Sequence, residues 1–180
     1  ASFAYPSLLA QTRATAINVP VIPHEAVPNF FKHPPGIYTG ENMGIATNSK
    51  GNIYIYHRAN ETRLFEYSPQ GAFIREIGRG VYSHAFAHSV RVDAQDNIWA
   101  VDEGTVILVT FSPESKVLMT IGRREDPLAC LGNIPGSGRY HGRNEKYRFG
   151  RQTDAAFDQQ GNLFVADGYF AGRVVKSDKN

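Results

Sequence analysis

The feature that most constrains this chain is a segment that occurs three times along it. Each copy has a short apolar run, a polar turn, an asparagine and a second apolar run. The copies are GIATNSKGNIYIYHR at 44–58, SVRVDAQDNIWAVDE at 89–103 and DAAFDQQGNLFVADG at 154–168. The shared asparagines are Asn52, Asn97 and Asn162, so the intervals are 45 and 65 residues. Such a period indicates one supersecondary unit stacked on copies of itself.

The turn inside each unit has a recognisable chemistry. It opens on a residue whose side chain can accept a hydrogen bond from the backbone two residues on; these are Asn48, Asp93 and Asp158. The position that most needs a positive φ is filled by Gly51, Asp96 and Gly161. The strand after each turn is apolar on both faces, which suits a strand sandwiched between neighbouring sheets.

A third strand follows in each unit, and a fourth ends the first two units at Ile77-Gly78 and Ile121-Gly122. The fold class predicted is all-β: a β-propeller with about three four-stranded blades and an incomplete ring. Because propellers close with about four to eight blades, three blades leave unpaired edges that invite association. The expected divisions are an extended Pro-rich arm at 1–42, a partial propeller at 43–180 with blades at about 43–80, 86–122 and 150–180, and an insert at 123–149.

Composition restricts the classes of partner. The net charge of +2 is too small to indicate nucleic acid or an anionic membrane. No apolar run reaches the roughly 18 residues of a membrane span, although peripheral association with a membrane complex stays open. The single Cys130 allows no internal disulfide. Residues 14–16 fit an A-x-A cleavage site without a basic segment before it, so we expect an ordered N-terminal arm instead.

The stretch 139–151, at the end of the insert, carries five cations against one acid, with aromatic residues between them. Basic residues interleaved with aromatics suit single-stranded nucleic acid, whereas a charged loop of this size is more often solvated or docked on protein. We predict protein partners, not nucleic acid, contacted through the open blade edges, the arm and the basic stretch 139–151. Its cations are Arg139, Arg143, Lys146, Arg148 and Arg151.

The D-x-x-G-N turn, the apolar strand after it and the closing I-G resemble NHL repeats. More closely, three stretches resemble the six-bladed propeller of peptidyl-α-hydroxyglycine α-amidating lyases and their bacterial relatives: residues 55–58, 87–93 and 153–169. The resemblance covers about residues 43–122 and 147–180. It implies an extracytoplasmic protein, periplasmic or secreted.

The resemblance also implies site residues. In those lyases three histidines hold zinc, an arginine binds the substrate and a tyrosine is the base on its hydroxyl. His88 matches the first zinc ligand, Arg58 the arginine and Tyr169 the tyrosine. The backbone carbonyls of Ile45 and Val90 match positions near a structural calcium. The other two zinc ligands fall in later blades, and the positions of a family disulfide fall near Gly150 and Phe170, which are not cysteines.

Each of these residues has a structural alternative. A single histidine does not make a catalytic zinc site, which takes three protein ligands, so His88 could instead be a hydrogen-bonded channel residue. Arg58 could clamp a carboxylate or pair with a loop acid such as Glu61 or Glu103. A tyrosine serves as a base only where a cation lowers its pKa from about 10; otherwise Tyr169 is a loop aromatic.

Local spacing gives three smaller predictions. His84 lies four residues before His88, but outside a helix this is not a metal-binding pair. Asp167 and Arg173 are expected to pair across the loop between two strands. Unit two has Ile107 where the others have an arginine, which leaves Asp102 and Glu103 without that local partner.

Two functions remain in view because a fold does not settle an activity. The first is a non-catalytic interaction or scaffold subunit, derived from a propeller and docked in a larger extracytoplasmic assembly. The second is a metal-dependent lyase of the amidating type, represented here in part.

Overall fold

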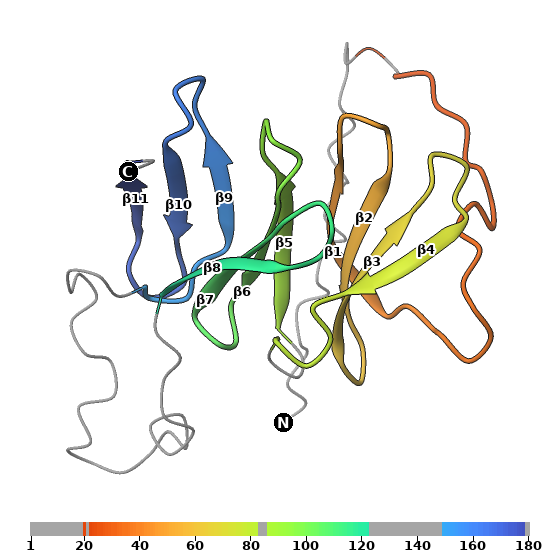
Figure 1. Cartoon of the computed structure of the whole chain (residues 1–180), viewed down its shortest axis with the longest axis horizontal. Coiled ribbons are helices and arrows are strands. Elements are labelled where there is room, and N and C mark those ends of the chain that lie inside the picture. Colours follow the sequence, from red (N-terminus) through yellow and green to blue (C-terminus); the bar gives the residue numbers. More distant parts are fainter. Residues whose placement is uncertain (1–19, 21, 83–85, 123–148, 179–180) are drawn as a thin grey trace, which may run out of the picture.

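A computed structural model describes residues 20, 22–82, 86–122 and 149–178. His84, Cys130, residues 1–16 and the insert up to residue 148 lie outside these ranges, so the predictions that concern them stay predictions. The described residues form eleven strands in three antiparallel sheets that stand side by side and do not close into a ring (Figure 1). The predicted partial β-propeller is confirmed.

Each sheet is a meander whose strands pair in chain order. Blade 1 contains β1 (Glu41–Thr47), β2 (Ile53–Arg58), β3 (Thr62–Tyr67) and β4 (Phe73–Ile77). Blade 2 contains β5 (Ala87–Val92), β6 (Ile98–Asp102), β7 (Ile107–Phe111) and β8 (Val117–Gly122). Blade 3 has three strands in the described range, namely β9 (Asp154–Phe157), β10 (Leu163–Asp167) and β11 (Arg173–Ser177). No described helix is long and apolar enough to cross a bilayer.

The turns between the first two strands of each blade form as their residues dictate. In blade 2, the Asp93 carboxylate accepts backbone hydrogen bonds from Gln95 and Asn97, both at 2.9 Å. The backbone of Asp96 takes φ 62°, and Gly51 and Gly161 take 80° and 83° at the same position. A turn satisfied within five residues needs little help from the rest of the fold, which explains why sequence alone located it.

The blades stack through apolar side chains on facing sheets. One core cluster joins Tyr54, Tyr56 and Leu64 of blade 1 to residues of blade 2, and another joins Trp99 and Val101 of blade 2 to residues of blade 3. The first strands β1, β5 and β9 lie next to one another and so form the inner edge of the stack. This arrangement buries both faces of β6, all five of whose residues are buried.

Glycine permits a close approach between blades 1 and 2 at the inner edge. A Cβ atom on Gly44 in β1 would lie 2.6 Å from the backbone nitrogen of Val90 in β5. Real Cβ atoms do not approach backbone this closely, so any larger residue must push the two inner strands apart. The spacing of the blades at the inner edge therefore depends on the absence of a side chain at position 44.

The arm folds back on blade 1. Phe31 and Ile37 pack on the core formed by Ile55, Phe65 and Tyr67, which lies on the face turned away from blade 2. His33 Nδ1 lies 2.8 Å from the Tyr67 hydroxyl, and the backbone of Lys32 donates to the carbonyl of Gly71 at 2.8 Å. Part of the predicted arm thus covers an end face of the stack, as a cap does for an open repeat.

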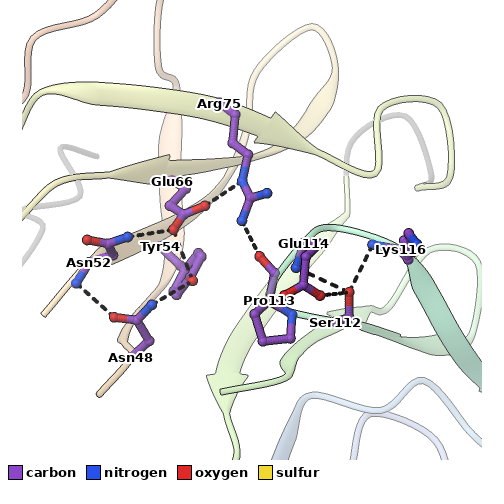
Figure 2. Close-up of polar contacts among 9 residues, drawn as sticks. All are labelled: Asn48, Asn52, Tyr54, Glu66, Arg75, Ser112, Pro113, Glu114 and Lys116. Atoms are coloured by element: carbon purple, nitrogen blue, oxygen red, sulfur yellow. Dashed lines mark hydrogen bonds and ion pairs between the residues drawn. The ribbon is translucent and has the colours of Figure 1, made fainter. Parts of the chain in front are cut away.

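A buried carboxylate joins blade 1 to blade 2 on the outer side (Figure 2). Glu66 accepts hydrogen bonds from Asn52 at 2.8 Å, the Tyr54 hydroxyl at 3.2 Å and Arg75 at 2.6 Å. Arg75 also donates to the carbonyl of Pro113 in the turn before β8. Burial raises the pKa of the Tyr54 hydroxyl to about 12, and the negative charge of Glu66 contributes to the rise. The hydroxyl therefore stays protonated and acts as a donor. Arg75 neutralises a carboxylate that would be costly to bury alone.

Candidate functional site

The residues singled out by sequence gather at one end of the stack, where β2 ends, β5 begins and β10 ends. Cross-strand pairing skips His88 in β5, and it skips Met43 at the equivalent place in β1. Both residues therefore sit at β-bulges of an inner strand. Bulges re-aim a side chain and are enriched next to active sites. The alignment of the units predicts this equivalence, and it explains why His88 projects differently from the residues on either side of it.

His88 and Tyr169 meet across the boundary between blades 2 and 3. The Tyr169 hydroxyl lies 3.4 Å from His88 Nε2, and the two rings are edge to face with centroids 5.8 Å apart. Nδ1 of His88 is buried and has no hydrogen-bond partner among the described residues. The structure thus brings together two of the three residues implied by the resemblance, although they are 81 positions apart.

Tyr169 belongs to the short loop between β10 and β11. Its backbone has a φ of 40°, which is unusual for a residue with a side chain, and its relative exposure is 65%. The neighbouring pair predicted from spacing is present: Arg173 Nε donates to Asp167 Oδ2 at 2.9 Å. The Tyr169 ring is therefore presented to solvent from a loop whose base is fixed.

Arg58 lies at the same end of the stack, at the end of β2. It pairs with Glu41 of β1, with Nε 2.7 Å from Oε2. Arg58 thus pairs with an acid, as its structural alternative expected, but the acid is Glu41 and not Glu61 or Glu103, because the pairing of β1 with β2 places residue 41 directly opposite residue 58. Arg58, Glu41 and Phe86 line an open hollow of about 500 Å³. Phe86 precedes His88 by two residues, so the hollow adjoins the histidine's segment.

Arg151 is a residue whose position sequence reasoning missed. We expected it on a solvated or docking surface and Glu103 without its local partner. Instead, Arg151 Nη1 lies 3.1 Å from Glu103 Oε1, and the Glu103 side chain is only 4% exposed. Asp102 next to it is satisfied by the backbone of Gly104 and the hydroxyl of Thr105. The missing arginine of unit two is thus replaced by a cation from the segment before β9.

His57 does not join the site. It alternates with Arg58 along β2 and is buried on the face covered by the arm, with its ring 4.8 Å from that of Phe65. Burial is the main reason why the pKa of His57 is lowered from 6.5 to about 4, and the nearby charges of Arg63 and His33 lower it further. Of the two neighbours, only Arg58 is turned to the candidate site.

The described residues do not complete a catalytic zinc site. They contain no group of three or more His, Cys, Asp or Glu side chains placed to hold a metal ion. His88 alone falls short of three protein ligands, so no chemical step is assigned to zinc here. The structural calcium near the carbonyls of Ile45 and Val90 stays a prediction; β1 and β5 do lie side by side there, but calcium takes six to eight oxygen ligands.

Comparison with known proteins agrees with the resemblance. The chain is 26% identical over 208 aligned residues to peptidyl-α-hydroxyglycine α-amidating lyase 1 of Drosophila melanogaster, covering 93% of the chain and 35% of the relative. It is 26% identical over 171 residues to peptidylglycine α-amidating monooxygenase of Rattus norvegicus, covering 79% of the chain and 16% of the relative. The chain therefore spans well under half the length of these relatives. No protein-family model matches it.

Solved structures support the fold alone. A streptogramin B lyase superimposes with a TM-score of 0.50 at 10% identity, covering 79% of this chain and 42% of that one. A protein of Bacteroides fragilis, provisionally described as exported, gives 0.53 at 18% identity, covering 83% and 38%. The chain is therefore a partial β-propeller of three stacked blades, and its relatives in sequence include amidating lyases.

Proposed function

We propose that this chain supplies part of the active site of a lyase that acts on peptidyl-α-hydroxyglycine. The observation that carries the proposal is the contact between Tyr169 and His88, two residues that the resemblance matches to the lyase site and that lie 3.4 Å apart. The relatives in sequence are named for that activity. The remaining zinc ligands of such a site fall outside the described residues.

The geometry suits proton removal from a substrate hydroxyl. Tyr169 is exposed, so a substrate can reach its oxygen, and His88 Nε2 offers a hydrogen-bond partner on its other side. Tyr169 can act as the base only as a phenolate, which a bound cation would favour. The phenolate oxygen then takes the proton of the α-hydroxyl, and the electrons of that O–H bond form the carbonyl of glyoxylate. The C–N bond breaks, and the peptide leaves as its amide after taking up a proton. Zinc, when bound, would polarise the reacting oxygens.

Arg58 is placed to hold a carboxylate. Its present partner, Glu41, has a side chain that is 71% exposed. An exposed ion pair contributes only about 0–1 kcal/mol, so a substrate carboxylate can displace Glu41 at small cost. The planar guanidinium would then bind the glycine carboxylate with two hydrogen bonds.

The test is turnover of a synthetic peptidyl-α-hydroxyglycine by the intact protein supplied with zinc. We expect amide and glyoxylate in equal amounts, and a loss of about 100-fold in Tyr169→Phe, the scale of general-base removal. Tyr38→Phe is the matched control, since this tyrosine is also highly exposed, at 83%, and does not line the hollow at Arg58. Absence of turnover by folded protein, with and without zinc, would refute the proposal.

A second candidate is an interaction or scaffold subunit of an extracytoplasmic assembly. It is favoured by three consecutive exposed apolar residues on the edge strand β8: Val117, Leu118 and Met119 are 52%, 55% and 46% exposed. Edge strands of this kind invite pairing with another chain. If Leu118→Lys dissociates a complex isolated from the source organism while the lyase assay is negative, this function replaces the first.

A further inference from the structure

The loop that carries Tyr169 has few apolar contacts of its own at the tyrosine. Tyr169 has a positive φ, and such residues persist only where their surroundings hold them. Its side chain is mostly exposed and so buries little apolar area of its own. Contact with His88 at 3.4 Å is too long to supply the restraint alone. The base of the loop is fixed by Arg173 and Asp167, so a contact that bridges the tyrosine's segment and the histidine's segment would complete the restraint.

Arg151 contacts both sides of this pair. Its guanidinium lies 5.5 Å from the ring centroid of Phe170, the residue after Tyr169. It lies 5.4 Å from the ring centroid of Phe86, two residues before His88. Its ion pair with the buried Glu103 anchors the guanidinium beside the end of β6. One side chain thus links the segment of the tyrosine to the segment of the histidine.

The backbone beside Arg151 is fitted to the same loop. The amide of Phe170 donates to the carbonyl of Gly150 at 3.0 Å, and the amide of Gly150 donates to Asp167 Oδ1 at 2.6 Å. A Cβ atom on Gly150 would lie 2.8 Å from atoms of Ala171. The segment that carries Arg151 therefore cannot move away without disturbing the Tyr169 loop.

We propose that Arg151 is a positioning residue that holds Tyr169 against His88. The inference rests on the proposed function for its catalytic meaning, but the geometry it asserts can be measured without turnover. An arginine suits the task because a planar guanidinium stacks on aromatic rings while it pairs with a carboxylate. A displacement of the tyrosine by about 1 Å would lower the rate by up to about 100-fold.

The test compares Arg151→Ala with Arg91→Ala in the full chain. Arg91 pairs with Asp154 of β9 at 2.5 Å, between blades 2 and 3, so it controls for the loss of an inter-blade ion pair whose partner is outside the Tyr169 loop. The readout is the nuclear Overhauser effect between ring protons of His88 and Tyr169 in selectively labelled protein. We expect Arg151→Ala to lose this signal and Arg91→Ala to keep it.

If Arg151→Ala does not fold, the double variant Glu103→Gln/Arg151→Met removes the unpaired buried charge along with the guanidinium. Retention of the ring-to-ring signal in either folded variant would overturn the proposal, as would its absence from the wild type. If the wild-type protein shows the ring-to-ring signal but has no lyase activity, the lyase function is refuted. The positioning role of Arg151 is then still decided by the spectra of the variants.

Discussion

His57 provides the sharpest test of how the arm and blade 1 pack together. The ring is 1% exposed, and neither of its nitrogens has a hydrogen-bond partner among the described residues. It is buried between the blade and the arm, near the charges of Arg63, His33 and Glu76. Protonation places a charge in this apolar site, so acid should weaken the folded state through this residue. The perturbation is a fall in pH from 8 to 5.

The magnitude follows from the two pKa values. The unfolded chain has a histidine pKa near 6.5 and the folded chain one of about 4. The neutral form is favoured by folding, so the contribution to stability is complete above pH 6.5 and is lost as the pH falls toward 4. One pKa unit corresponds to about 1.4 kcal/mol, so about 3 kcal/mol is lost below pH 4 and about 2 kcal/mol by pH 5.

Urea unfolding at pH 8, 7, 6 and 5, followed by circular dichroism, measures this loss in the wild type and in His57→Phe. Phenylalanine keeps the ring and removes the titrating group, so the variant should lack about 2 kcal/mol of the wild-type decrease between pH 8 and 5. His24→Gln controls for an exposed histidine and should follow the wild type. Identical pH dependence in the wild type and His57→Phe would show that this residue is not buried as described.

Three further perturbations address the packing of the blades, each measured as the free energy of unfolding in urea. Gly44→Ala should destabilise by about 2 kcal/mol, because the new methyl meets the backbone of Val90; an unchanged value would mean that the inner strands are further apart. Arg75→Ala should cost about 2 kcal/mol by leaving the carboxylate of Glu66 buried without its cation, less than for a fully buried pair because Arg75 is 34% exposed; in a Glu66→Gln background the same change should cost much less. Phe31→Ala should cost about 1–2 kcal/mol, since this ring is only partly buried, and should speed proteolysis of the arm; unaltered stability and proteolysis would mean that the arm is not docked.

The candidate site was only partly accessible from sequence. His88, Tyr169 and Arg58 could be named from a resemblance, but their proximity could not, since it depends on how blade 3 is set against blade 2. Arg151 carried no signal beyond its place in a basic stretch. The sequence did single out its buried partner Glu103, because unit two lacks the arginine found in the other units. That missing arginine was the available signal that a cation from elsewhere in the chain pairs with Glu103.

The sequence by itself determined those features that depend on residues close together in the chain. The turns at Asn48, Asp93 and Asp158 satisfy their own backbone within a few residues, and the apolar runs after them can form only buried strands, so the repeat, the blades and their order were readable. Only the tertiary structure decided which charges pair across strands and blades, and that the arm lies on blade 1. Those contacts join residues tens of positions apart, and their free energy exists only after the sheets have stacked.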